Sequence, residues 1–143
     1  MQPTPEQLAM FRKHAAQVPY LQLLDIQLDA LGDGTAEMSV HIQHKHLQPL
    51  GIAHGGVIAS LMDSVTWWAA RAAQSFDREH HILSVDLKLN YLASLKPGRA
   101  IARAHCKKSG ARLCYSVGEV LDERGRLIAD GSSTLLITRP DEG

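Results

Sequence analysis

The sequence predicts an α+β protein in which a curved antiparallel β-sheet wraps around one long central α-helix. The segment from Gly55 to about Ser75 has helical length and is apolar on nearly all sides through Ala70, so other elements must enclose it. The C-terminal half contains strand-like segments separated by turn signals, which can form the enclosing sheet. A chain of 143 residues suits one domain with a single core, and we expect that domain to span residues 1–143.

The N-terminal half predicts a short helix, a hairpin and a loop. Thr4-Pro5-Glu6-Gln7 has the form of a capping box and is followed by apolar residues at helical spacing. Gly32-Asp33-Gly34 separates two strand-like segments, Leu21–Leu31 and Thr35–Ile42, which predicts a hairpin. His44–Ala53 has no periodicity, so we expect a loop that leads into the central helix.

Four further strands are expected in the C-terminal half, joined by turns that contain glycine: His81–Leu92, Arg99–Lys107, Leu113–Leu121 and Leu127–Thr138. In the first of these strands, polar and apolar residues alternate without a break from Ser84 to Tyr91. Because successive side chains of a strand point to opposite faces, Ser84 and Leu87 are expected on opposite sides of the sheet.

The charge balance limits the classes of partner. The 15 basic and 15 acidic residues give a formal net charge of zero, so the chain lacks the single-sign field that attracts nucleic acid or anionic membranes. We therefore expect neither nucleic acid nor membrane as a partner. The apolar run at 55–70 is shorter than the roughly 20 residues of a membrane span, and the N-terminus lacks the features of a signal peptide. A cytoplasmic protein is expected.

Cysteine and histidine usage gives no sign of a metal site. Cys106 and Cys114 are too few for a disulfide framework, and we expect both to be reduced strand residues, although they could face one another across a hairpin. The histidines around the central helix follow no zinc-binding pattern, so no metal is expected: His44, His46, His80 and His81.

Asp63 is the most informative residue of the chain. It is the one ionisable group in the apolar segment 55–70, and a carboxylate in such a setting is either partnered or used in chemistry. His54-Gly55-Gly56 opens the same segment, and its glycines would let a ligand approach backbone N–H groups at a helix N-terminus. The structural alternative is a buried acid capped by a neighbouring hydroxyl, from Ser60, Ser64 or Thr66.

The run His54–Asp63 (HGGVIASLMD), followed by Ser84-Val85-Asp86-Leu87 and ending in Tyr91, resembles the hotdog-fold acyl-CoA thioesterases, especially the phenylacetate-degradation type. The resemblance extends from about Leu24 to Ile137. It implies a sheet wrapped around a long helix, a homodimer that joins the two sheets edge to edge, and pairing of dimers into a homotetramer. It also implies hydrolysis of an acyl-CoA, aryl-acyl or short to medium in chain length, to the free acid and coenzyme A. Coenzyme A is then part of the substrate, and no separate cofactor is expected.

Residue by residue, the resemblance implies catalytic roles. Gly55, with Gly56 behind it, would present a backbone N–H to the thioester carbonyl, and Asp63 would be the general base or the nucleophile. Ser84 would orient the attacking water or the acid, and the Gln48 amide would hold the water or the thioester oxygen. The structural alternatives are tight packing for the two glycines, a strand start for the serine and a solvated loop position for the glutamine.

Four other residues are candidate site residues, and each also has a purely structural interpretation. His54 either fixes the loop or takes a direct part in the chemistry. Trp67 either packs in the core or an interface or lines the acyl pocket. Lys108 and Arg112 bracket the Ser109-Gly110 turn, where they could hold the phosphates of coenzyme A or simply form a charged hairpin tip.

The spacing on the central helix predicts a site shared between two subunits. A helix rises about 1.5 Å per residue, which puts Asp63 roughly 12 Å along the axis from Gly55. The two residues therefore cannot serve one ligand within a single chain. If two copies of the helix run antiparallel about a two-fold axis, Gly55 of one chain can approach Asp63 of the other.

Two other functions remain as alternatives to a thioesterase with this fold. One is a hydratase or dehydratase acting on acyl carriers, whose pattern places a catalytic histidine and an acid differently. The other is a non-catalytic acyl-CoA binding or regulatory protein, which has no need of an acid in an apolar helix. A serine hydrolase is disfavoured because the chain has no Gly-x-Ser-x-Gly sequence.

Overall fold

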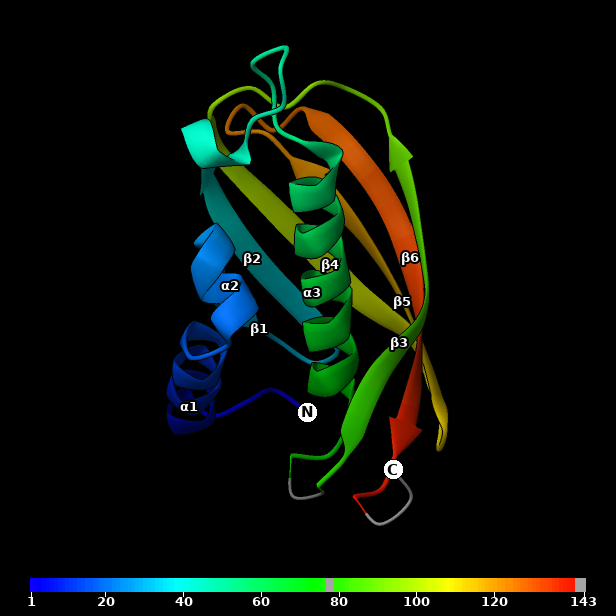
Figure 1. Ribbon diagram of the computed structural model, residues 1–143. Coiled ribbons are helices and arrows are strands. Elements are labelled where there is room, and N and C mark those ends of the chain that lie inside the picture. Colours follow the sequence, from blue (N-terminus) through cyan, green and yellow to red (C-terminus); the bar gives the residue numbers. More distant parts are fainter. Residues whose placement is uncertain (77–78, 141–143) are drawn as a thin grey trace.

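In the computed structural model, which describes residues 1–76 and 79–140, a six-stranded sheet curves around the helix α3 (Gly55–Ala73) (Figure 1). The strand order is β1-β2-β4-β5-β6-β3, and every neighbouring pair is antiparallel. This confirms the predicted fold class. The strand bounds are β1 Gln27–Leu31, β2 Thr35–Ile42, β3 His81–Tyr91, β4 Gly98–Ser109, β5 Leu113–Leu121 and β6 Leu127–Thr138.

Two short helices precede the sheet and lie at one side of α3. The first, α1 (Pro5–Ala16), begins at the predicted capping box, in which Thr4 and Gln7 each accept a hydrogen bond from the other's backbone N–H. The second, α2 (Pro19–Leu24), corrects the predicted strand Leu21–Leu31, which begins only at Gln27. The reason is local: proline at the first helical position has its φ preset for a helix.

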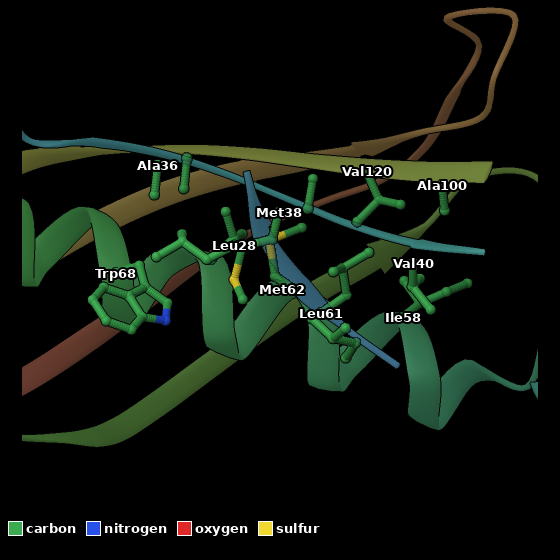
Figure 2. Close-up of a cluster of buried hydrophobic side chains, with 14 of the residues drawn as sticks. Leu28, Ala36, Met38, Val40, Ile58, Leu61, Met62, Trp68, Ala100 and Val120 are labelled. Carbon is green, nitrogen blue, oxygen red and sulfur yellow. The ribbon is translucent and has the colours of Figure 1, made fainter. Parts of the chain in front are cut away.

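The central helix packs against the concave face of the sheet through a nearly continuous apolar surface. Figure 2 shows Ile58, Leu61 and Met62 of α3 among side chains of the strands, including Met38 and Val40 of β2. Met62 lies so close to β5 that a Cβ added to Gly118 would be 2.9 Å from the Met62 sulfur. A glycine at this position therefore lets the helix approach the sheet.

The edge strand β3 contains a bulge that overturns the predicted alternation. Ser84 pairs with Leu135 of β6, and Asp86 pairs with Thr134, so Val85 is an extra residue in the ladder. Ser84 consequently faces α3, as does Leu87, which packs against the core. The prediction that these two residues lie on opposite faces is wrong, because the bulge shifts the side-chain period by one residue.

The loop before α3 is held in place by a buried histidine. His46 accepts a hydrogen bond from the Gln43 N–H at 2.9 Å through Nδ1, and its Nε2 lies 2.7 Å from the Leu24 carbonyl oxygen. The His46 carbonyl in turn accepts the His54 N–H at 2.8 Å. This chain of contacts fixes the residue from which α3 starts.

Both cysteines are free thiols on the β4–β5 hairpin, as predicted, with Cys114 buried and Cys106 partly exposed. A hydrogen bond between the two thiols lowers the pKa of Cys114 and raises the pKa of Cys106. Within the described residues, no helix is both long enough and apolar enough to cross a membrane.

Candidate active site

Asp63 and Ser84 form a hydrogen-bonded pair between the middle of α3 and the edge strand β3. The Ser84 hydroxyl donates to Oδ1 of Asp63 at 2.8 Å. No described residue donates a hydrogen bond to the other carboxylate oxygen, Oδ2, and Asp63 is partly exposed. The pair therefore offers one oxygen fixed by the protein and one oxygen open to a ligand or to water.

The structural alternative for Asp63, capping by a neighbouring hydroxyl, is wrong. Ser60, Ser64 and Thr66 each donate to a backbone carbonyl one turn earlier in the helix, at 2.7–2.8 Å. Hydroxyl groups in helices commonly bond in this way. Their hydrogen atoms are thus used within the helix, and the partner of the Asp63 side chain comes from β3 instead.

The N-terminus of α3 presents a free backbone donor. His54 is the N-cap residue, and its Nδ1 accepts the Gly56 N–H at 2.8 Å. Among the described residues, no acceptor lies within hydrogen-bond distance of the Gly55 N–H. The donor at the positive end of the helix dipole is therefore available at Gly55, whereas the N–H of Gly56 is already bonded within the chain. Substrate binding by Gly56 stays a prediction.

The same hydrogen bond fixes the tautomer of His54. A ring nitrogen that accepts a hydrogen bond carries no proton, so the proton of the neutral imidazole is on Nε2. A Cβ added to Gly56 would lie 2.9 Å from Nδ1 of His54, so a side chain at that position would displace the ring. The second glycine of the motif is thus required by the histidine cap.

Tyr91 holds the first turn of α3 and was not recognised as a site residue from the sequence. Its hydroxyl donates to the Gly55 carbonyl at 2.9 Å, and a Cβ added to Gly55 would lie 3.4 Å from its ring. The signal in the sequence was its place at the end of the alternating run Ser84–Tyr91. Tyr91 therefore connects β3, which also carries Ser84, to the start of the helix.

Gln48 lies in the loop that precedes α3, and its side chain folds back on that loop. Its Oε1 accepts the Leu50 N–H, and its backbone N–H donates to the Ile52 carbonyl at 2.9 Å. No described residue accepts a hydrogen bond from its amide NH₂ group, which is left as a donor. In one chain the predicted residues thus form two groups: Gln48 and His54-Gly55-Gly56 at the helix start, and Asp63 with Ser84 about 12 Å further along.

A cavity of about 1010 Å³ lies beside Asp63, between α3 and the N-terminal helices. Trp67 borders it one helical turn after Asp63, with its indole N–H donating to the Ile82 carbonyl at 2.8 Å. The Trp67 ring meets that of Trp68, with 5.0 Å between ring centroids. Trp67 is therefore placed to line a pocket that reaches the carboxylate.

The two candidate phosphate-binding residues lie at the other end of the molecule. Lys108 and Arg112 flank the β4–β5 hairpin turn, whose Ser109 contacts Gln74 and the Ala73 carbonyl at the end of α3. Figure 1 shows this hairpin and the loop before α3 at opposite ends of the sheet. One chain therefore does not bring these cations to Gly55, which is roughly 27 Å away along the helix.

Comparison with known proteins decides the family. A family model described as the thioesterase superfamily matches residues 50–129, which is more than half of the chain. The chain belongs to the thioesterase superfamily. A 1,4-dihydroxy-2-naphthoyl-CoA hydrolase of Escherichia coli (strain K12) is 29% identical over 116 residues, covering 80% of this chain and 82% of that protein. Acyl-coenzyme A thioesterase 13 of Mus musculus is 32% identical over 95 residues, covering 65% and 66% of the two chains.

Solved structures of other thioesterases share the fold. A thioesterase family protein from Silicibacter pomeroyi superimposes with a TM-score of 0.84 at 26% identity, covering 92% of this chain and 98% of that one. A thioesterase from Haemophilus influenzae has a TM-score of 0.82 at 22% identity, over 97% and 93% of the two chains. The resemblance to hotdog-fold thioesterases inferred from the sequence is confirmed.

Two features of the site bear on its chemistry: an Asp63 carboxylate oxygen that is open beside a cavity, and a Gly55 N–H at the start of α3 that has no acceptor among the described residues. An N–H at a helix N-terminus can stabilise an oxyanion, and a carboxylate with an open oxygen can act as a base or as a nucleophile. Within residues 1–76 and 79–140, no three His, Cys, Asp or Glu side chains are placed to hold a metal ion.

Proposed function

We propose that this chain hydrolyses acyl-CoA thioesters to the free acid and coenzyme A, with Asp63 as the catalytic carboxylate. The observation that supports this most is the Asp63 side chain itself, held at 2.8 Å by Ser84 with its second oxygen open beside a cavity. The names of the Escherichia coli and mouse relatives, both of which refer to coenzyme A esters, support the substrate class.

The Gly55 N–H polarises the thioester carbonyl and stabilises the negative charge that grows on its oxygen as the carbon is attacked. His54 Nε2–H and the Gln48 amide, which lie at the same helix terminus, are further donors. Asp63 then acts in one of two ways. It removes a proton from water, whose oxygen adds to the carbonyl carbon, or it attacks that carbon and forms an anhydride that water later cleaves. In both cases the carbon–sulfur bond breaks and the thiolate of coenzyme A receives a proton.

The complete site is proposed to need two copies of the chain. The roughly 12 Å of helix between Gly55 and Asp63 is too long for one thioester carbonyl to reach both groups in one chain. The edge strand β3 has a free edge in the six-stranded sheet, and its Leu83 and Val85 side chains are 55% and 56% exposed. Two β3 strands pairing about a two-fold axis would cover those edges and bring Gly55 of one subunit near Asp63 of its partner.

The test is a hydrolysis screen over aryl-acyl, short-chain and medium-chain CoA esters, with thiol release as the readout. We expect turnover of at least one class by the wild type and a loss of about a hundredfold or more in Asp63→Asn, since this is the typical contribution of a general base. Asp33→Asn changes an exposed carboxylate in the β1–β2 turn and should leave the rate unchanged.

Three results would overturn the proposal. The first is thiol release that Asp63→Asn retains at more than about a tenth of the wild-type rate. The second is tight binding of acyl-CoA esters with no thiol release at all, which would make the chain a binding protein. The third is conversion of an unsaturated acyl-CoA to a hydrated product with the thioester intact, which would make it a hydratase.

A further inference from the structure

The cavity beside Asp63 is lined mainly by aromatic and apolar side chains. It is bordered on one side by α3 and on the other by α1 and α2, with residues 79–81 at the start of β3 also in its wall, and its volume is about 1010 Å³. Its aromatic lining residues are Phe11, Tyr20, Trp67, Trp68 and Phe76. A cavity of this size and composition suits the burial of a rigid apolar group.

One stripe of α3 runs along this cavity and carries three different chemical groups. Asp63, Trp67 and Arg71 are spaced four residues apart, which places them on the same side of the helix, and all three line the cavity. The Cα atoms of Asp63 and Arg71 are about 12 Å apart along the axis. The indole therefore lies between the proposed reacting carboxylate and a cation further along the same pocket.

Arg71 has no acidic partner among the residues that the structure describes. Its guanidinium lies over the rings of Phe11 and Phe76, 5.5 Å from each centroid, and the one hydrogen bond that it makes to the described residues, to the Ser75 carbonyl, is 3.5 Å long. Glu79 lines the same cavity but forms no ion pair with Arg71. Partial burial lowers the pKa of Arg71, as expected for a cation that has lost water and gained no counter-ion.

A second polar group in the cavity also lacks a partner. Nδ1 of His80 is buried and has no hydrogen-bond partner in the described part of the chain, although His80 lines the cavity. Buried polar groups are normally hydrogen-bonded, and an orphaned one calls for an explanation. Arg71 can only donate, which favours a ligand with an oxygen acceptor in addition to an apolar body, and His80 Nδ1 is a second polar atom that such a ligand could contact.

We propose that the acyl group cleaved by this enzyme is aromatic and carries an acidic oxygen substituent remote from the thioester, which Arg71 binds at the far end of the cavity. This inference rests on the proposed function. The aromatic lining selects flat rings, and a guanidinium that lies over two neighbouring rings can recognise a carboxylate or a phenolic oxygen. The Cα atoms of Asp63 and Arg71 are about 12 Å apart along the helix axis, and part of that distance is taken up by the two side chains. The space that is left can hold one or two rings.

The experiment compares two matched esters, 2-naphthoyl-CoA and 6-carboxy-2-naphthoyl-CoA, through the ratio of their kcat/KM values. For the wild type we expect the carboxylated ester to be preferred at least tenfold. In Arg71→Met the preference should fall at least tenfold, through loss of activity on the carboxylated ester alone. Arg124→Met removes an exposed arginine from the β5–β6 turn and should leave the ratio unchanged.

The ratio separates recognition from a structural role. If Arg71 only stabilised α1 through Phe11, the variant would lose activity on both esters equally and the ratio would stay at its wild-type value, which would overturn the inference. A wild type that cleaves both esters with equal efficiency would also overturn it, and this result needs no variant that folds. Cleavage of simple acyl-CoA esters but of neither naphthoyl ester would overturn this inference alone. Absence of any thioester cleavage would overturn the proposed function as well.

Discussion

The Ser84 hydroxyl lies 2.8 Å from Oδ1 of Asp63 because a bulge at Val85 turns Ser84 toward α3. Without the extra residue, the strand period that places Leu87 in the core would put Ser84 on the outer face of the sheet. The bulge therefore creates the one side-chain hydrogen bond, within the described part of the chain, that fixes the proposed catalytic carboxylate. Bulges often serve to re-aim a side chain in this way.

Ser84→Ala tests whether this contact positions Asp63. A hydrogen bond to a charged group is worth roughly 1.5–3 kcal/mol, so we expect kcat to fall by about tenfold to a hundredfold while KM changes little. Ser84→Thr keeps the hydroxyl and should retain more activity than Ser84→Ala. Steady-state kinetics on the best ester from the screen measures both effects, and an unchanged kcat in Ser84→Ala would leave the serine as a simple strand residue.

Gly56→Ala tests the packing of the histidine cap. The new Cβ would be 2.9 Å from Nδ1 of His54, so the ring must leave the Gly56 N–H, and loss of an N-cap costs about 1 kcal/mol. In the His54→Ala background the same substitution should be neutral or stabilising, because alanine is otherwise favoured over glycine in a helix. Urea unfolding of the four proteins of this double-mutant cycle measures the coupling. Equal effects in both backgrounds would show that the contact does not constrain position 56.

Complementation between two inactive variants tests the shared site. Gly55→Pro removes the N–H donor at a position where proline fits a helix, and the preceding His54 already has the extended backbone that a following proline requires, with φ −61° and ψ 139°. Mixed with Asp63→Ala chains and refolded together, half of the dimers are heterodimers with one intact site of two, so we expect about a quarter of the wild-type activity. Size-exclusion chromatography and differential tagging establish that heterodimers form. Heterodimers without activity would show that Gly55 and Asp63 act within one chain.

Much of the architecture follows from the sequence because it depends on regular patterns. The apolar segment after His54 could only be a wrapped helix, and the capping box at Thr4 fixed the start of α1. The helix α2 was missed because Pro19–Leu24 is a short apolar run, and such a run fits a strand as well as a helix. Here Pro19, at the first position of the segment, favours the helix.

Part of the candidate site could also be predicted from the sequence, and part of it could not. The glycines and Asp63 were found because they stand in one contiguous segment, where an acid among apolar residues is conspicuous. The Tyr91 contact with Gly55 and the cavity position of Arg71 come from segments that only the tertiary structure brings together. The bulge at Val85 was not predictable, because no glycine marks it and the local alternation continues through it.

Charge reversal at Lys108 and Arg112 tests where the phosphates of coenzyme A bind. The hairpin that carries them lies beside the last turn of α3, roughly 15 Å along the helix axis from Asp63 of the same chain and roughly 27 Å from Gly55. Two exposed charge contacts are together worth roughly 1–2 kcal/mol, so Lys108→Glu with Arg112→Glu should raise KM for a CoA ester several-fold.

Turnover of the same acyl group on N-acetylcysteamine, which lacks the nucleotide, should be unchanged, because exposed phosphate contacts supply binding that is equal in the ground state and the transition state. Lys13→Glu with Arg124→Glu, which changes the net charge by the same amount at two exposed positions away from this hairpin, is the matched control for charge alone. A KM for the CoA ester that stays within a factor of about two, or roughly 0.4 kcal/mol, would place the phosphate site on other residues.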